Sequence, residues 1–388
     1  MKLPQTVITV IAAAAFCVAC PAMFAWAQST GQQSSGQQPF VQLQHGGVYP
    51  GALPSVPAMS AKDVPTAAGV PRQTFAGPSG NVLHTMLTVQ GAAARSAAIG
   101  FDNAGGPLVY HAGGQIMNPG VIVYAIFWAP AHLQNGGATG FSANYGLPTL
   151  ISTAWLQSHG LMNIGTQYYQ TISGTTTYFQ NMGGLQAYVV DTGALPGSGC
   201  NDTVTPGNCV TDAQIQAKIQ AVMTAQGWSG GINKIFVMFT SSGEGSCIDG
   251  SSTECSYTQY CAYHSYFNFG GQNVIYANIP YGNSSGCQAG GQTTPNDLAG
   301  DIAANATTHE IMESATDPLL NAWYGSLGGS SEIGDLCAYI FGTNTWGSGA
   351  GAGNQMWNGI IMEVQQEYDN HAYTLSGNTS GCVSVGPQ

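Results

Sequence analysis

The stretch from Thr307 to Pro318 reads Thr-Thr-His-Glu-Ile-Met-Glu-Ser-Ala-Thr-Asp-Pro, and it guides the interpretation of the rest of the chain. The surrounding sequence predicts a helix that begins after Pro295, with Asn296 as its N-cap. The helix is expected to end at Asp317, because a residue that precedes proline is pushed out of the helical region. Most other positions are Ala, Ile, Leu or Met, so this helix is expected to be buried.

Polar side chains recur every four residues along the predicted helix, at Asp301, Asn305, His309, Glu313 and Asp317. Residues four apart lie on the same face of a helix. Burial of charged groups is costly unless they are paired or bind a metal. The polar stripe therefore requires a partner elsewhere in the chain.

The segment His309-Glu310-x-x-Glu313 resembles the zincin signature His-Glu-x-x-His, with Glu in place of the second His. In that signature, residues i and i+4 bind one Zn²⁺ and the Glu at i+1 activates a metal-bound water. The pattern predicts His309 and Glu313 as ligands and Glu310 as the general base. In the gluzincin branch a glutamate about twenty residues downstream completes the site, which makes Glu332 the first candidate and Asp335 the second.

Two other interpretations of the same residues stay open. His309 and Glu313 can hydrogen-bond to each other, with Glu332 or Asp335 joining the next loop to the helix. Alternatively, the protein fills every position around a structural metal ion. The spacing of the residues alone does not separate these arrangements from a catalytic one.

The N-terminus has the features of an export signal, predicted over residues 1–27. Lys2 precedes the apolar run Val7–Met23, and Ala25-Trp26-Ala27 is a suitable cleavage site. The alternative is an uncleaved membrane anchor, but the run is short and a polar segment follows it. We expect a secreted, extracellular or periplasmic protein without stable membrane insertion after signal removal. Residues 28–80, rich in Gln, Ser, Gly and Pro, predict a flexible leader before a globular domain over 81–388.

Cysteine usage fits this location. Of the 10 cysteines, two lie in the predicted signal, and an even number remains. In an exported chain that number predicts disulfides rather than a metal cluster. Cys200 and Cys209 bracket a short loop and are expected to pair, while the remaining connectivity stays open. The disulfide candidates are Cys200, Cys209, Cys247, Cys255, Cys261, Cys287, Cys337 and Cys382.

The formal charge of −12, with only 6 Lys and Arg, disfavours nucleic acid as a partner because such a surface repels phosphates. The 18 tyrosines suggest an aromatic surface for a peptide or glycan ligand. The sequence carries no signal for an oligomeric state.

Strand and helix patterns alternate along much of the chain. They predict an α/β or α+β fold, with one large domain, a mixed β-sheet, the buried helix of His309 and disulfide-linked loops. A helix is expected at Leu147–His159, and an amphipathic helix from Thr211 to Gly227. The expected strands are Val82–Val89, Val121–Trp128, Thr175–Gln180, Leu185–Val190, Ile235–Thr240 and Asn273–Pro280, with Glu363–Tyr368 and His371–Leu375 closing the sheet.

Several spaced motifs resemble the EXORDIUM-like (phosphate-induced protein) family. The block from His309 to Pro318, then Asn321-Ala322-Trp323-Tyr324, then Glu332-Ile333-Gly334-Asp335-Leu336-Cys337 is similar to that family's signature series. The same order continues in Tyr110-His111-x-Gly113-Gly114, Phe239–Ser242, Cys261-x-x-His264, Tyr276-Ala277 and Cys287, so that the resemblance covers about residues 105–385. It implies a secreted or cell-wall location and, in plants, an association with growth. It implies no established reaction.

Two function hypotheses follow. The first is a secreted metal-dependent hydrolase of zincin type, with Zn²⁺ as cofactor and His264 or His111 stabilising the tetrahedral intermediate. The second is a non-enzymatic extracellular protein, in which the same residues form a buried polar network or a structural metal site.

Overall fold

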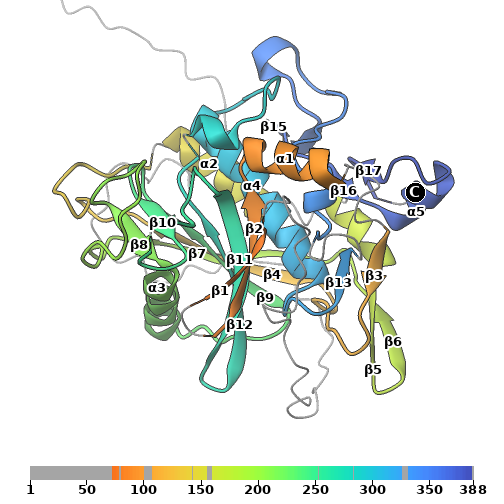
Figure 1. Ribbon diagram of the computed structural model, residues 1–388, viewed down its shortest axis with the longest axis horizontal. Helices are drawn as coiled ribbons and strands as arrows, with labels where there is room; N and C mark the ends of the chain where they lie inside the picture. The colour runs from red at the N-terminus through yellow and green to blue at the C-terminus, as the bar shows by residue number, and fades with distance from the viewer. Residues whose placement is uncertain are drawn as a thin grey trace, which may run out of the picture. The chain divides into compact units, whose positions relative to one another are not determined.

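A seven-stranded mixed β-sheet forms the centre of the computed structural model (Figure 1). The structure describes residues 72–77, 80–99, 107–141, 143–154, 160–251, 253–282, 284–325 and 331–386, all within one compact unit, Pro54–Gln388. The predicted signal segment and most of the leader lie outside these residues. In order across the sheet, the strands are β1 (Thr74–Ala76), β2 (Val82–Leu87), β11 (Tyr260–Phe269), β12 (Gln272–Ile279), β9 (Lys234–Phe239), β4 (Val121–Trp128) and β7 (Gly183–Asp191).

The sheet has an antiparallel half and a parallel half. Strands β1, β2, β11 and β12 pair antiparallel, whereas β12, β9, β4 and β7 pair parallel. Parallel strands in the centre of a sheet are covered on both faces, so their sequences are nearly continuous apolar runs. The run Val121–Trp128 therefore predicted strand β4 well. The expected mixed sheet is therefore confirmed. Strand β1 falls inside the predicted leader, so the described fold begins before Gly80.

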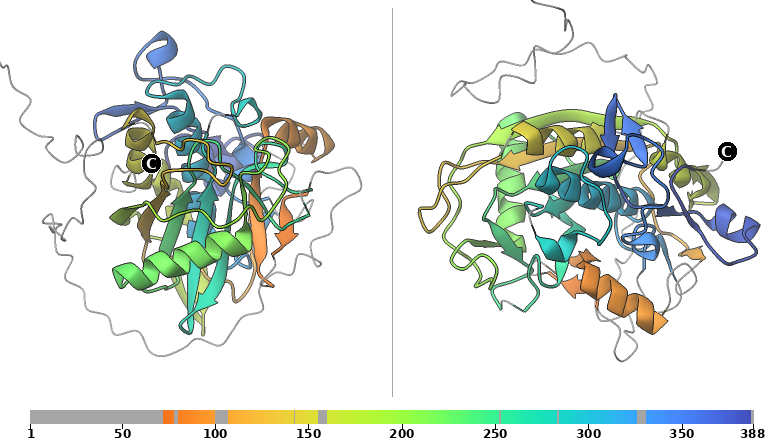
Figure 2. Two further views of the ribbon diagram at one scale, coloured as in Figure 1. Left: turned by 90° about the vertical axis from the view of Figure 1, so that its left-hand side faces the viewer. Right: turned by 90° about the horizontal axis from the view of Figure 1, so that it is seen from above.

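Helices cover both faces of the sheet (Figure 2). Helix α3 (Asp212–Gln226) packs Ile215, Ile219 and Val222 against one face, as its amphipathic pattern predicts. It begins at the N-cap Thr211 and ends at Gly227, whose φ of 69° suits glycine. Helix α4 (Leu298–Thr316) packs against β11 and β12 with α2 (Ala143–Ala154) beside it, and α1 (Val89–Ile99) follows β2.

Helix α4 is the predicted His309 helix, and it is buried along most of its length. Its C-cap is Asp317, as expected, but its N-cap is Asp297 rather than Asn296. The Asp297 side chain accepts a hydrogen bond from the Gly300 amide at 2.9 Å. The Asn296 side chain instead donates a hydrogen bond to Asp301 Oδ1 at 2.7 Å. Asp301, the first residue of the polar stripe, thereby gains a hydrogen-bond partner.

The C-terminal part of the chain does not close the sheet, and that prediction is wrong. His371–Leu375 lies in a short helix, α5 (Asn370–Leu375), and Glu363–Tyr368 contributes only to a small separate pair. Pairs of two to four residues are too short to extend a large sheet. The small pairs are β3 (Leu108–Tyr110) with β13 (Trp323–Gly325), β5 (Tyr169–Ile172) with β6 (Thr175–Tyr178), β8 (Cys209–Thr211) with β10 (Gly245–Cys247), β14 (Gln355–Trp357) with β15 (Ile360–Met362), and β16 (Glu367–Tyr368) with β17 (Cys382–Val383).

Four disulfides join the loops. The predicted pair Cys200–Cys209 is confirmed, and the others are Cys247–Cys255, Cys261–Cys287 and Cys337–Cys382. Within the described part of the chain, no helix is both long and apolar enough to cross a bilayer.

The Cys337–Cys382 bond is expected to contribute most to stability, because it closes the longest loop, with a sequence separation of 45. The chain-entropy relation gives about 4 kcal/mol for such a loop. For Cys247–Cys255, with a separation of 8, it gives about 2.5 kcal/mol. Double Cys→Ser variants of each pair, compared by urea unfolding, should lose stability in that order. Equal losses would contradict this ranking.

Candidate metal centre

Seven ionisable side chains meet between the sheet and helix α4. They come from four segments, namely β2, β11, α4 and the residues that follow β13. We call this group the histidine–carboxylate cluster; its members are His84, His264, His309, Glu310, Glu313, Glu332 and Asp335.

The sheet contributes two histidines side by side. His84 of β2 pairs in register with His264 of β11, and their rings lie 5.6 Å apart. Because side chains alternate along a strand, the neighbouring Leu83 and Tyr263 point to the opposite face and join the core under α3. Antiparallel pairing therefore places both imidazoles on the face that α4 covers.

Helix α4 supplies three residues within one turn. His309 Nε2 lies 3.0 Å from Glu313 Oε1, as the four-residue spacing predicts. The other carboxylate oxygen, Glu313 Oε2, lies 3.4 Å from His264 Nδ1. Glu310, one position further round the helix, places Oε2 at 3.1 Å from the same nitrogen. The helix thus faces the two sheet histidines with two carboxylates.

Both candidates for the third ligand reach the cluster. Asp335 Oδ2 lies 2.7 Å from His84 Nε2, and Oδ1 lies 3.7 Å from His309 Nε2. Glu332 lies between the sheet histidines, with Oε1 at 3.4 Å from His84 Nδ1 and Oε2 at 3.8 Å from His264 Nε2. Asp335, the second candidate, is therefore the one beside His309.

Hydrogen bonds and close packing hold these groups in place. Gln73 donates to Asp335 Oδ1, and the Glu332 amide donates to Asp335 Oδ2 at 2.8 Å. Gly334 lies against the His309 ring, where an added Cβ would be 2.6 Å from Nδ1. Only glycine fits this position without displacing the ring.

Gln365 fixes the far side of His309. Its amide nitrogen lies 3.0 Å from His309 Nδ1 and donates to the Gly334 carbonyl at 2.8 Å. In this orientation Nδ1 accepts, so the neutral ring carries its proton on Nε2. Metal binding through Nε2 requires the opposite tautomer, with the Gln365 amide turned so that its oxygen accepts from Nδ1–H.

The cluster is completely buried, yet many of its polar atoms lack an aligned hydrogen bond. Six of its residues have 0 % exposure and Asp335 has 7 %. Two triads, His84/Glu313/Asp335 and His264/Glu310/Glu313, each bring one donor atom per residue within 4.8 Å of one another. Within the cluster, the buried side-chain atoms without a hydrogen-bond partner among the described residues are His84 Nδ1, His264 Nε2, His309 Nε2, Glu310 Oε1, Glu313 Oε1 and Oε2, and Glu332 Oε1 and Oε2.

Burial and neighbouring charges shift the pKa values of the three glutamates in different directions. Burial, reinforced by Glu313, raises the pKa of Glu310 well above its usual range, and burial with Asp317 does the same for Glu332. Burial also opposes the charge of Glu313, but His309 and His84 outweigh it and lower the pKa of Glu313. In the metal-free protein, Glu313 is therefore the ionised member of the three glutamates at neutral pH.

The pKa values of the three histidines also shift in different directions. Burial opposes the charged form of His84 and His309, but Asp335 and Glu313 more than offset it, so both pKa values are raised. Burial lowers the pKa of His264. The cluster thus contains two imidazoles that favour protons and one that favours its neutral, ligand-competent form.

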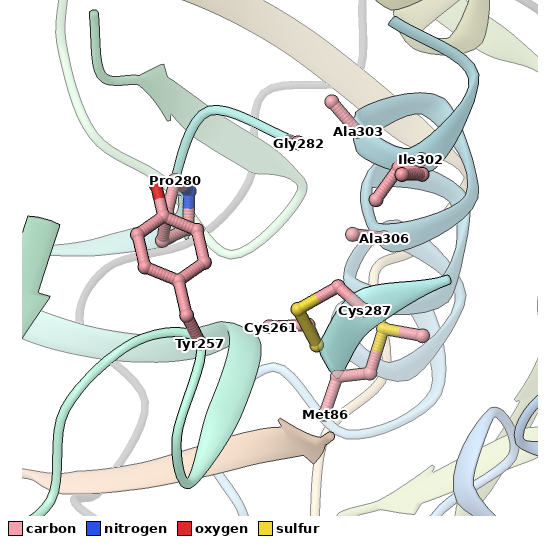
Figure 3. Close-up of a pocket in the computed structure, with 9 residues that line it drawn as sticks. All are labelled: Met86, Tyr257, Cys261, Pro280, Gly282, Cys287, Ile302, Ala303 and Ala306. Carbon is pink, nitrogen blue, oxygen red and sulfur yellow. A yellow bond between two sulfur atoms is a disulfide. The ribbon is translucent and has the colours of Figure 1, made fainter. Parts of the chain in front are cut away.

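A small cavity between β2, β11 and α4 does not belong to the cluster, and Figure 3 shows the residues that line it. Its volume is about 10 Å³, the space of one water molecule. Apolar groups line it, among them Met86 of β2, Ala306 of α4 and the Cys261–Cys287 disulfide. None of the seven cluster residues lines this cavity, so it does not offer a substrate a path to them.

The sequence identified five of the seven residues and assigned His264 a different role. His84 was missed, because a histidine inside a strand pattern has no local signal for a ligand. His111 lies outside the cluster; its ring stacks on Tyr324 at 3.4 Å. The aromatic-rich run Tyr260–Phe269 around His264 was a usable signal for β11, a strand that was not predicted.

Asp317 ends the polar stripe and shapes the following turn. Its Oδ1 accepts hydrogen bonds from the amides of Asn321 at 2.5 Å and Ala322 at 2.7 Å. Burial raises its pKa from the model-compound value of 3.8 to about 7. Since the folded pKa is the higher one, this group's contribution to stability is complete below about pH 4 and is lost as the pH rises through 7.

Replacement of Asp317 by Asn should flatten this pH dependence. Asp317→Asn keeps the Oδ1 acceptor but cannot ionise. We compare the free energy of unfolding of the variant with that of the wild type at each pH. The difference should favour the variant by about 1–3 kcal/mol more at pH 8 than at pH 5. Urea unfolding of both proteins at the two pH values measures it. Parallel stability curves would show that Asp317 does not titrate in this range.

Comparison of the chain with protein-family models, curated proteins and solved structures gave no match. The geometry of the cluster is therefore the basis for inferring its function.

Proposed function

We propose that the protein is an extracellular metal-binding protein of EXORDIUM-like type, whose fold encloses a divalent cation, Zn²⁺, in the histidine–carboxylate cluster. One observation carries the proposal: seven buried ligand-type side chains from four segments converge, and many of their polar atoms lack hydrogen-bond partners. Burial of polar atoms without partners is costly, and a bound cation would satisfy them.

The distances within the cluster favour a cation over a hydrogen-bond network. In tetrahedral zinc sites with bonds of about 2.0–2.1 Å, neighbouring ligand atoms lie about 3.4 Å apart. Four of the nitrogen–oxygen distances in the cluster fall between 3.0 and 3.4 Å. A network would instead join these pairs by aligned hydrogen bonds. Among the histidine–carboxylate pairs of the cluster, only His84 with Asp335 at 2.7 Å and His264 with Glu310 at 3.1 Å form one.

The donor types support zinc as the first ion to test. Imidazole nitrogen and carboxylate oxygen are both common zinc ligands. The eight described cysteines are all in disulfides, so the group Cys200, Cys209 and Cys247 offers no thiolate. The same disulfides support an oxidising, extracellular location.

A closed site agrees best with a structural role for the metal. Structural zinc sites fill all positions with protein ligands, whereas catalytic sites leave one open for water or substrate. With every cluster residue buried, the arrangement is of the closed type.

A hydrolase of zincin type is the second candidate, favoured by one feature. Glu310 directly follows His309, as the general base does in the zincin signature, and it is buried beside His264. If it is the general base, Glu310→Gln should retain zinc and lose cleavage of a general protein substrate such as casein. Equal cleavage by both proteins would remove this candidate.

Metal analysis of the purified protein tests the main proposal. We expect bound zinc in the wild type and at least a tenfold loss of affinity in His309→Ala, which removes one ligand. His371→Ala, at an exposed position in α5, is the matched control and should bind like the wild type. Absence of zinc from wild-type protein, both as purified and after incubation with Zn²⁺, would overturn the proposal.

A further inference from the structure

We infer that the histidine–carboxylate cluster is a two-metal centre, with Glu313 bridging two divalent cations. This inference depends on the proposed function, and it changes the expected role of Glu310 from general base to metal ligand.

The position of Glu313 is the first argument. Its two oxygens face different histidines: Oε1 lies 3.0 Å from His309 Nε2, and Oε2 lies 3.4 Å from His264 Nδ1. A carboxylate that presents one oxygen to each of two ligand sets has the geometry of a bridge. In two-metal sites the ions lie about 3.5–4 Å apart, a separation that a bridging carboxylate can span.

The number of ligands is the second argument. Seven side chains exceed the four that a tetrahedral ion accepts. Divided around Glu313, they make two complete sets that share it. The first set is His84, His309, Asp335 and Glu313, and the second is His264, Glu310, Glu332 and Glu313.

The two buried triads overlap in the same manner. The triad His84/Glu313/Asp335 and the triad His264/Glu310/Glu313 have only Glu313 in common. Each contains a histidine from the sheet and a carboxylate outside the bridge. The sheet and the helix thus contribute to both halves of the site.

Charge balance is the third argument. The cluster contains four carboxylates and three imidazoles. When all four carboxylates bind metal they lose their protons, and two dications with neutral imidazoles then balance their charge. The fully occupied centre is therefore neutral, without uncompensated buried charge.

The stoichiometry of the wild-type protein tests this inference without requiring any variant to fold. Metal-stripped protein is titrated with Zn²⁺ and with Mn²⁺, and bound metal is counted per chain. We expect two equivalents of each. Two bridged Mn²⁺ ions couple magnetically, so the six-line electron paramagnetic resonance signal of isolated Mn²⁺ should be broadened and reduced.

Variants then assign the two sets of ligands. Glu310→Gln should bind one Mn²⁺ and recover the six-line signal, whereas a general base would leave the stoichiometry unchanged. His264→Ala should behave like Glu310→Gln, and the control His371→Ala should keep two coupled ions. Near-UV circular dichroism confirms that each variant is folded.

The outcomes separate the two proposals. Two coupled equivalents in the wild type support the two-metal centre. One equivalent, or two without coupling, overturns it while leaving a metal-binding function in place. No bound metal overturns the proposed function itself.

Discussion

Saturation with Zn²⁺ should raise the melting temperature of the metal-stripped protein by about 8 °C for each bound ion. A ligand present at 1,000 times its Kd stabilises the folded state by about 4 kcal/mol for each site. A domain of this size gains about 2 °C or slightly more for each kcal/mol. The physical cause is that the cation satisfies buried carboxylate oxygens, since both oxygens of Glu313 and Glu332 and Oε1 of Glu310 lack hydrogen-bond partners in the described structure.

Differential scanning calorimetry of stripped and reconstituted protein measures this shift. Mg²⁺ at the same concentration is the control, because it prefers octahedral oxygen ligands and retains water. The comparison must be made without thiol reductant, so that the four disulfides stay intact. An identical melting temperature with and without Zn²⁺ would favour the polar network.

Removal of the negative charge of Glu313 should be the most damaging single substitution in the cluster. In the metal-free protein this carboxylate compensates His84 and His309, whose pKa values are raised by the surrounding acids. Glu313→Gln leaves these charges buried without compensation, and we expect a loss of about 3–5 kcal/mol in the free energy of unfolding. Urea unfolding at pH 6 measures the change.

Glu367→Gln provides a matched control. Glu367 is also fully buried, and burial together with Glu313 raises its pKa well above the usual range, so it is a neutral acid. Glutamine closely resembles a protonated glutamate, and the expected loss is below about 1 kcal/mol. Similar losses in the two variants would show that Glu313 is not the main countercharge of the histidines.

The sequence predicted the helix of the site better than its surroundings. The spacing of His309 and Glu313 and the stop before Pro318 are local properties, and the structure confirms both. The N-cap was assigned to Asn296 instead of Asp297 because adjacent Asn and Asp residues are equally good caps. Which of them caps depends on the contact of Asn296 with Asp301.

The two histidines from the sheet meet because of the register between β2 and β11, and a local sequence pattern does not reveal strand register. His84 acquires its role only because β2 pairs with β11 and places it opposite His264. That pairing joins residues far apart in the chain. The positions of Glu332 and Asp335 likewise depend on packing, since Gly334 brings this segment against the His309 ring.

The C-terminal strands were predicted wrongly for a related reason. Segments such as Glu363–Tyr368 have strand-like composition, but composition does not reveal whether a sheet edge is available. Here residues 355–383 form small separate pairs, and the backbone amide of Gln365, which lies between them, donates to Asn305 Oδ1 of α4 at 2.6 Å.

The pairing of His84 with His264 also determines when the centre can exist during biosynthesis. Ribosomes deliver β2 early, yet its partner strand emerges much later, and Asp335 lies 251 residues beyond His84. A chain that ended before residue 331 would contain β2, β11 and α4 but neither Glu332 nor Asp335. Only a chain synthesised beyond Asp335 can therefore complete the centre, so ion capture would follow synthesis and docking of the segment after β13.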